Sequence, residues 1–207
     1  KLYDLQIRRH DELQNEAAGQ QTRESTVAAS RGTIYDRNYH PLATSATAEN
    51  VCISPLELAA FVRKQEEANE AARKKAEESG KTYVPARVLD EAYVARGLSR
   101  ILGVEEEEIL RLAAMTATQY QRVTRRVEQD VADEVRRFMN GEIDDEGREL
   151  TFVNEDGRTR LLSDPKKAPT ALQGIFLELD SRRYYPYGAL AANVVGFVNG
   201  ENQGAYG

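Results

Sequence analysis

The sequence has very few of the residues from which disulfide frameworks and metal sites are built. Its 207 residues include one cysteine, Cys52, and two histidines, His10 and His40. A single cysteine cannot form an intrachain disulfide, which excludes a small disulfide-stapled fold. The histidines stand far apart without partners at ligand spacing, whereas a zinc site needs three or four ligands in a recognisable pattern. We therefore expect no metal, and we expect Cys52 to be buried as a small hydrophobic side chain.

Long apolar runs and basic stripes are missing as well. No apolar run approaches the roughly 18 residues of a membrane-spanning helix, and the first residues contain no apolar core of a signal peptide. The 28 Lys and Arg residues are mixed with 34 Asp and Glu residues, for a net charge of -6. A protein that follows a phosphate backbone needs a basic stripe, so we exclude nucleic acid as a partner. No glycine-rich phosphate loop occurs in a strand–turn–helix context, so the sequence predicts no cofactor.

The residues that are present predict a modest core under a heavily charged surface, with 41% hydrophobic and 30% charged residues. Residues 1–30 are polar, and we interpret them as a stalk. Short β-branched and aromatic runs predict strands near 33–35, 42–45 and 51–53. The alternation over 175–185 predicts another strand. Short, half-polar strands cannot bury a face alone, so we expect the first and last of these segments to meet in one sheet.

The middle of the sequence predicts a helical lobe. Over residues 56–80 an alanine stripe and opposite charges four residues apart predict a helix that buries little, and that is largely solvated or faces a partner. Apolar repeats predict further helices over 88–102, 105–113 and 127–138. A hairpin is predicted over 152–162 and a short helix over 191–198.

The expected fold is therefore α+β. A small mixed or antiparallel sheet joins segments near 33–53 and 175–185. Residues 56–139 form a helical insertion in a domain that spans 31–207.

One short motif suggests a serine nucleophile. Ser163-Asp164-Pro165-Lys166 fits S-x-x-K, in which a lysine activates a serine on the same helix face. Pro165 would have to lie in the first turn of a helix, and the following residues are not helical in pattern. The motif's companions are also missing, because no S-x-N follows. We expect no catalytic residue, with a serine enzyme using Ser163 and Lys166 as an alternative.

Two further clusters favour structural roles. Arg31, Asp36 and Arg37 bracket a predicted strand and could form an ion-pair cluster that fixes a turn, and Gly32 suggests a close backbone approach or an unusual φ. Three tyrosines surround Pro186, which indicates a strand end with packed rings and hydrogen-bonded hydroxyls. The alternative is an aromatic recognition surface on a free-standing binding or sensor domain.

The same two clusters resemble signatures of class B penicillin-binding proteins. Residues 31–43 are similar to R-G-x-I-x-D-R-N-G-x-x-L-A, and residues 183–198 are similar to R-x-Y-P-x-G-x-L-A-x-x-V-x-G-F-V. The residues that we assign to the structural motif are Arg31, Gly32, Asp36, Arg37, Arg183, Tyr184, Tyr185, Pro186, Gly188 and Gly196. Tyr39 departs from the pattern, because it stands where the family has the glycine of N-G. The resemblance covers roughly residues 15–207, and the helical middle matches weakly.

This resemblance implies a non-catalytic pedestal, historically called a dimerisation domain, of a serine-type D,D-transpeptidase that crosslinks peptidoglycan and binds penicillin. The family's membrane helix is expected before residue 1, and its transpeptidase domain is expected beyond residue 207. The implied partners are that transpeptidase domain, a polytopic membrane glycosyltransferase of the shape, elongation, division and sporulation class, and a second copy of the chain. The implied location is the extracytoplasmic face of a bacterial cell membrane.

Overall fold

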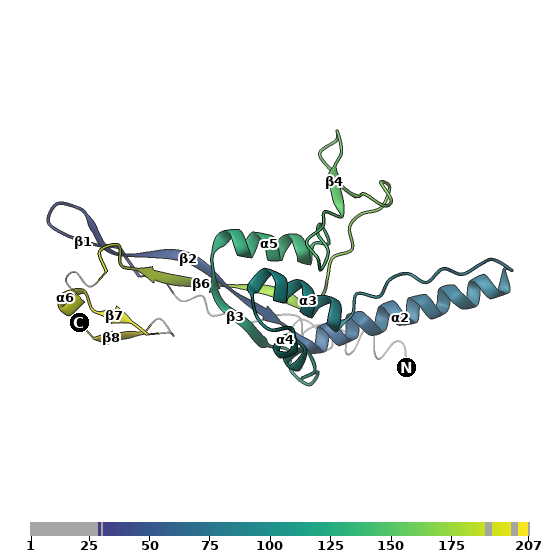
Figure 1. The fold of residues 1–207 in the computed structure, drawn as a ribbon, viewed down its shortest axis with the longest axis horizontal. Helices are drawn as coiled ribbons and strands as arrows, with labels where there is room; N and C mark the ends of the chain where they lie inside the picture. The colour runs from purple at the N-terminus through teal and green to yellow at the C-terminus, as the bar shows by residue number, and fades with distance from the viewer. Residues whose placement is uncertain (1–28, 30, 189–191, 200–202, 207) are drawn as a thin grey trace, which may run out of the picture.

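The computed structural model describes residue 29 and residues 31–188, 192–199 and 203–206. The stalk predicted over residues 1–30 lies outside this part of the chain, apart from residue 29. The elements are β1 (Ile34–Tyr35), β2 (Pro41–Ile53), α2 (Pro55–Glu78), α3 (Glu91–Leu102), α4 (Glu106–Ala113), β3 (Gln121–Val127), α5 (Gln129–Met139), β4 (Thr151–Val153), β5 (Thr159–Leu161), β6 (Ile175–Tyr184), α6 (Ala192–Val195), β7 (Phe197–Val198) and β8 (Gly204–Tyr206). Figure 1 shows an elongated molecule in which helices gather around the middle of a sheet. The expected α+β fold is confirmed.

The long strand β2 is the centre of a four-stranded antiparallel sheet. β6 pairs with it from Thr44 opposite Tyr184 to Ile53 opposite Ile175. On the other side, β1 pairs near the start of β2 and β3 pairs near its end. Segments far apart in the sequence therefore share one ladder, as predicted. The separate strands expected near 42–45 and 51–53 are a single strand of 13 residues.

β3 is a strand that the sequence did not predict. We expected a fourth helix to begin at Val127, whereas α5 begins at Gln129 and residues 121–127 pair with β2. Three arginines in seven residues give this strand a polar composition. Its valines, Val123 and Val127, nevertheless pack against the core. The free edge of β2 supplies the hydrogen bonds that decide between helix and strand here, which is a tertiary effect.

The core lies between one face of the sheet and the helices. Val51, Ile53 and Ile175 contribute from the strands, and all three are buried. On the helical side the ring of Phe138 stacks on Tyr93 with centroids 5.5 Å apart. The largest fully buried side chains are Phe138, Ile53, Leu58, Leu98, Ile109, Ile143, Val51, Val94 and Val135. A single apolar cluster therefore holds α2, α3, α4 and α5 to the sheet.

Close packing around Phe138 depends on a glycine in α3. A Cβ built at Gly97 would lie 2.2 Å from Phe138 Cζ. Because real side chains do not approach so closely, only glycine lets the ring lie flat on this helix. Gly97 therefore sets the distance between α3 and α5.

α2 is anchored at its first turns and projects from the lobe over the rest of its length. Ser54 caps the helix by accepting from the amide of Glu57, and Pro55 occupies the first turn, where its missing N–H costs nothing. The buried residues of the helix are Pro55, Leu58, Phe61 and Val62. Beyond Val62 the alanine-striped part is largely exposed, as expected, and Figure 1 shows it extending away from the other helices.

The segment between α2 and α3 runs back along α2, and we call residues 81–90 the return segment. Asn69 binds the backbone of Ala86 through both atoms of its amide, at 2.9 and 3.1 Å. One turn earlier on the helix, Gln65 binds the backbone of Leu89 in the same way, at 3.3 and 3.0 Å. Two side-chain amides thus replace the ladder that a neighbouring strand would supply.

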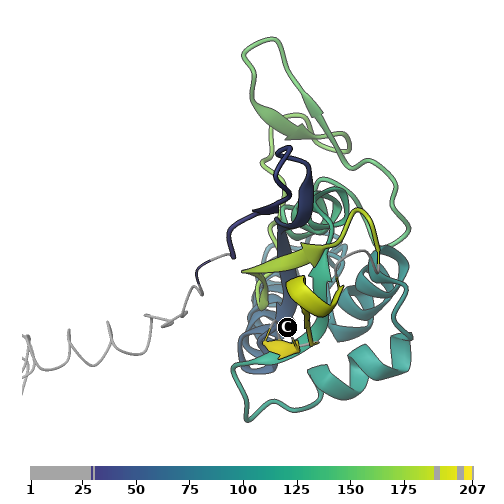
Figure 2. The same cartoon turned by 90° about the vertical axis from the view of Figure 1, so that its left-hand side faces the viewer.

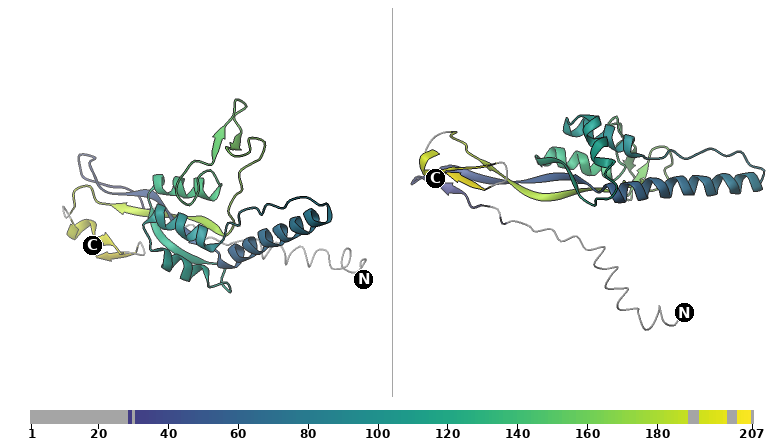
Figure 3. Two further views of the ribbon diagram at one scale, coloured as in Figure 1. Left: turned by 45° about the vertical axis from the view of Figure 1, so that its right-hand side comes forward. Right: turned by 90° about the horizontal axis from the view of Figure 1, so that it is seen from below.

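The opposite end of the molecule is a ribbon of β1, β2 and β6 that extends beyond the helices (Figures 1 and 3). β3 stops where Glu49 pairs with Val127, so the part of β2 before Glu49 and the part of β6 after Leu179 extend past it. We call this ribbon the arm. The hairpin predicted over 152–162 is confirmed as β4 and β5, and Figure 2 shows it standing away from the helical lobe.

Candidate functional site

The far end of the arm is built around Asp36, which organises the turn between β1 and β2. Asp36 Oδ1 accepts from the amides of Asn38 and His40, each at 2.8 Å, and Oδ2 lies 3.1 Å from His40 Nδ1. The His40 amide, more than any other contact, holds the pKa of this carboxyl below its usual value. Asp36 therefore fixes the turn through contacts within its own loop, and the ion-pair cluster suggested with Arg31 and Arg37 stays a prediction.

Tyr39 occupies the position where the family signature has glycine. Its φ is 64°, in the left-handed region that glycine adopts most readily. Its amide donates to the carbonyl of Asp36 at 3.1 Å, and its ring lies 6.3 Å from that of Tyr35. The turn keeps the backbone geometry expected of the glycine and adds an aromatic ring, which is 83% exposed.

Arg183 joins the two sequence motifs in space. Its NH1 donates to the carbonyl of Gly32 at 2.7 Å and to Ser45 Oγ at 3.0 Å, with a longer contact to the carbonyl of Arg31 at 3.4 Å. Gly32 does not have the unusual φ that the sequence suggested, and no described atom lies within 4 Å of the place of its Cβ. Its contribution is the carbonyl that Arg183 binds.

The remaining motif residues surround the turn that follows β6. Arg182 lies over the ring of Tyr184, 5.3 Å from its centroid, and the amide of Gly188 donates to the carbonyl of Tyr185 at 3.0 Å. Gly188 and Gly196 have φ values of 57° and 67°. Pro186 and Arg37 are exposed. The short helix predicted over 191–198 is in part correct, because α6 ends at Val195 and β7 follows.

Exposed apolar side chains collect at this end of the molecule. Tyr35, Tyr39, Tyr187, Val194 and Phe197 are each at least half exposed. Figures 1 and 3 place β1, α6, β7 and β8 together at the far end of the arm. We call this region the arm end. Such a group of exposed rings is typical of a surface that another protein covers.

Two buried polar residues, Glu49 and Asn50, lie where the arm meets the lobe. Glu49 is hydrogen-bonded to Arg136 of α5, which also binds Asp133. On the opposite face, Asn50 Oδ1 accepts from the amide of Arg126 at 3.1 Å, where the bulged strand β3 has a φ of 52°. The sequence analysis did not select these residues, although a Glu-Asn pair inside a strand of small and apolar residues is a signal that could have identified them.

The sheet face away from the helices carries a second polar cluster. Cys52 is fully buried there, as predicted, and its burial raises the pKa of the thiol. Tyr120 donates to Glu178 at 3.0 Å and accepts from Arg122 at 2.8 Å. Partial burial is the main cause that raises the pKa of Tyr120 to about 12. These groups hydrogen-bond to one another, and the raised pKa values keep the Cys52 thiol and the Tyr120 hydroxyl protonated at neutral pH.

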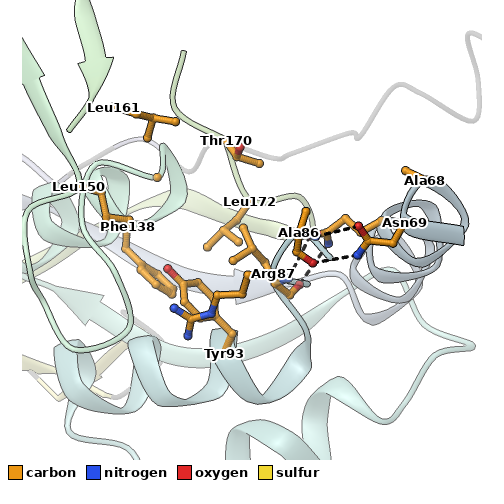
Figure 4. A pocket seen from close by; sticks show the side chains of 13 residues that line it. Ala68, Asn69, Ala86, Arg87, Tyr93, Phe138, Leu150, Leu161, Thr170 and Leu172 are labelled. Atoms are coloured by element: carbon orange, nitrogen blue, oxygen red, sulfur yellow. Dashed lines mark hydrogen bonds between the residues drawn. The ribbon is translucent and has the colours of Figure 1, made fainter. Parts of the chain in front are cut away.

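A cavity of about 340 Å³ opens between α2, the return segment and the loop after α5 (Figure 4). Its lining is mainly apolar and includes Leu150, Leu161 and Leu172. The polar groups at its rim already have partners, because Asn69 holds Ala86 and Arg87 lies 4.7 Å from the ring of Tyr93. A small-molecule site needs convergent polar groups to orient a ligand, and the amides of Gln65 and Asn69 on this lining are already engaged with the return segment.

The serine of the S-x-x-K motif, Ser163, lies in a turn. Ser163 is exposed after β5, and Asp164 fixes the following residues by accepting from the amides of Lys166 and Lys167 at 3.2 and 3.0 Å. Ser163 and Lys166 therefore do not share a helix face. The sequence analysis predicted this result, because the residues around Pro165 are not helical in pattern. Among the described residues there is no acidic, histidine or cysteine group suited to a metal ion. No helix in that part of the chain is long and apolar enough to cross a membrane.

Comparison with known proteins gives a family match and weaker structural likenesses. Residues 26–205 match the Penicillin-binding Protein dimerisation domain. Solved structures with a similar course of the chain include a peptidoglycan synthetase from Bifidobacterium adolescentis ATCC 15703, with 21% identity and a TM-score of 0.41, and Penicillin Binding Protein 2X from Streptococcus thermophilus, with 18% identity and a TM-score of 0.47. Each comparison covers 87% of this chain, and 27% and 22% of the respective structure, so the chain spans about a quarter of their length.

No curated protein gives a significant match to the sequence. The family match covers most of the chain, including both motifs that Arg183 joins. The chain therefore belongs to the penicillin-binding protein dimerisation domain family.

Proposed function

We propose that the chain is the non-catalytic pedestal of a longer class B penicillin-binding protein, a serine-type D,D-transpeptidase that crosslinks peptidoglycan. In this role the pedestal holds the transpeptidase domain away from the bacterial membrane, on its extracytoplasmic face. It also offers contact surfaces to a polytopic membrane glycosyltransferase and to a second copy of itself. The family match supports the pedestal role. The activity, the location and the partners of the parent protein are the part of the proposal that goes beyond this match.

The observation that carries the proposal is the junction made by Arg183. Both family motifs converge at one end of the molecule, where they build a turn and not a reaction centre. Asp36 and Arg183, one from each motif, both hydrogen-bond to backbone groups: Asp36 accepts from the amide of His40, and Arg183 donates to the carbonyl of Gly32. What the arm end presents outward is aromatic and apolar surface, which suits docking of a protein domain.

The last described strand, β8, also lies at the arm end (Figure 1). A transpeptidase domain joined after β8 would begin beside the exposed rings. We therefore place the contact with that domain at the arm end, and we assign the projecting half of α2 and the β4–β5 hairpin to contacts with other wall proteins.

A titration of the chain with the separately expressed transpeptidase domain of the same gene tests this assignment. Tyr39→Ser and Val84→Ser form a matched pair, because the two side chains are 83% and 81% exposed at opposite ends of the molecule. Tyr39→Ser should weaken binding by about tenfold, as expected for an aromatic contact residue, and Val84→Ser should leave it unchanged. Equal effects of the two substitutions, or no binding by the wild-type chain, would contradict the assignment.

A further inference from the structure

The apolar core of the molecule stops before the arm begins. β2 contributes Val51 and Ile53 to the buried cluster, and β6 contributes Ile175, with Leu177 packed against it. Among the described residues, no side chain of β2 before Val51 and none of β6 after Leu177 belongs to this cluster. The hydrogen-bond ladder between β2 and β6 continues into the arm, but such a ladder permits a range of twist between its strands. Packing in the core therefore does not fix the direction of the arm relative to the helical lobe.

Charged side chains join the arm to the lobe at the point where β3 ends. The chain passes from β3 into α5 here, between Val127 and Gln129 (Figure 1). On the sheet face that carries the helices, Arg136 of α5 is hydrogen-bonded to Glu49 of β2. Glu49 is 4% exposed, and it is the β2 residue that pairs with Val127. This ion pair therefore holds the base of the arm to α5.

The other face of the sheet carries ion pairs that cross the central strand. Arg126 Nε binds Asp180 at 3.2 Å, and Arg182 binds Glu128 at 3.6 Å. Arg126 and Glu128 lie at the end of β3, on one side of β2. Asp180 and Arg182 belong to β6, on the other side of β2. Each of these ion pairs must therefore span β2.

Small side chains in β2 leave room for this crossing. Asp180 pairs with Ala48, and Arg182 pairs with Ala46. Directly opposite residues of two strands lie on the same face, so these alanines lie on the face where the ion pairs cross. Ala48 is 4% exposed although the helices pack on the other face, which agrees with cover by the charged side chains.

The backbone of Arg126 has an uncommon conformation that the same contacts hold in place. Its φ is 52°, and β3 is bulged here, because its register on β2 shifts between Glu49 and Val51. A bulge re-aims a side chain, and a positive φ in a residue other than glycine persists only where its surroundings fix it. Asn50 Oδ1 accepts from the amide of Arg126 at 3.1 Å, and Asp180 binds its guanidinium. Both ends of this arginine are therefore fixed to the sheet.

We propose that residues 126–136 form an electrostatic brace that fixes the direction of the arm relative to the helical lobe. The brace grips the base of the arm on both faces of the sheet, through Glu49 on one face and through Asp180 and Arg182 on the other. Loss of its ion pairs leaves the ladder between β2 and β6 intact and lets the arm swing about the point where β3 ends. The inference does not depend on which protein docks at the arm end.

The distance between two spin labels, measured by pulsed electron paramagnetic resonance, reports the direction of the arm. One label is attached at Asn38→Cys in the arm end and the other at Glu107→Cys in α4, and both natural side chains are exposed. Cys52→Ala in every chain leaves only the two introduced thiols. With the brace intact, we expect a single narrow distribution of distances.

Two triple variants remove the same charge from different places. The brace variant neutralises the acidic partners at the base of the arm, Glu49→Gln, Glu128→Gln and Asp180→Asn. The control variant neutralises acidic partners of exposed arginines on α2 and α4, Glu67→Gln, Glu77→Gln and Glu108→Gln. The brace variant should widen the distance distribution by about twofold or more, because only the ladder and its range of twist then hold the arm. The control variant should leave the distribution unchanged.

A charge exchange tests the crossing of β2 by itself. Asp180→Arg alone brings an arginine to Arg126, and Arg126→Asp alone brings an aspartate to Asp180. Each single variant should widen the distribution, because like charges then meet across β2. The double variant restores an attractive pair in the opposite sense and should narrow the distribution again. A defect that is only structural would not be rescued in this way.

Circular dichroism at the temperature of the measurement establishes that each variant is folded. The charge exchange decides the question if the triple brace variant does not fold. Several results would overturn the inference: a broad distribution for the chain with an intact brace, a brace variant as narrow as that chain, a control variant as broad as the brace variant, or a double exchange no narrower than its single variants.

Discussion

Glu49 offers a direct test of how the helical lobe is held to the sheet. The residue is 4% exposed at the point where β3 ends, and its carboxylate is hydrogen-bonded to Arg136 of α5. Glu49→Gln keeps the shape of the side chain and removes its charge. The bond to Arg136 then changes from a bond between two charged groups, worth about 1.5–3 kcal/mol, to a weaker one, so we expect a loss of about 1–2 kcal/mol in the free energy of unfolding.

The expected loss is smaller than for a fully buried ion pair. Breaking such a pair costs about 3–5 kcal/mol, because the remaining charge has no other partner. Arg136, however, has a side chain that is 40% exposed and keeps Asp133 as a second partner. Water and Asp133 therefore solvate the guanidinium once Glu49 has lost its charge.

Urea unfolding of a double-mutant cycle gives the magnitude. Glu49→Gln, Arg136→Met and their combination should show a coupling energy of about 1–2 kcal/mol, as expected for residues in direct contact. Asp133→Asn is the matched control on the exposed side of Arg136, and it should cost less than about 0.5 kcal/mol. A coupling near zero, or equal losses for Glu49→Gln and Asp133→Asn, would refute this account of the junction.

Three further predictions follow from the contacts described above. Gly97→Ala should lower the free energy of unfolding by about 1–3 kcal/mol through overpacking against Phe138. Gly157→Ala should cost less, since no described atom lies near the place of its Cβ and only the strain of its φ of 72° remains. Equal urea midpoints for the two variants would contradict the packing argument. Asn69→Ala should release the return segment and speed amide exchange and proteolysis over residues 81–90, with the exposed Ala68→Ser as control; unchanged exchange would show that the amide bonds do not hold the segment. The folded state lowers the pKa of Asp36 below 3.8, so this carboxylate stabilises the turn above that pH and loses its contribution as the pH falls through the lowered value. The NMR chemical shifts of the Asn38 and His40 amides should therefore titrate together below pH 3.8. A midpoint above pH 3.8 would contradict the assignment.

Much of the fold could be predicted from local patterns. The pairing of β2 with β6 followed from the need of two half-polar strands to bury a face. The projecting half of α2 followed from an apolar stripe that narrows to alanine after Val62. The β4–β5 hairpin followed from turn residues between two short apolar pairs. In each case the decisive property lies within a few residues along the chain.

The features that could not be predicted depend on contacts across the fold. β3 is a strand because the edge of β2 is open beside it, and its own valines fit a helical repeat as well. Glu49 and Asn50 become a junction only when α5 and β3 lie on opposite sides of β2. Asp36 holds its turn through the amides of Asn38 and His40 and lies next to the His40 ring, and the sequence analysis did not select these local contacts.

The central claim, that this chain is the pedestal and not the reaction centre of a penicillin-binding protein, is tested most directly by labelling with a fluorescent penicillin. The chain and the full-length product of its gene are labelled side by side and separated on a denaturing gel. We predict a labelled band for the full-length protein and none for the chain. Stable labelling of the chain that disappears in the Ser163→Ala variant would contradict the claim.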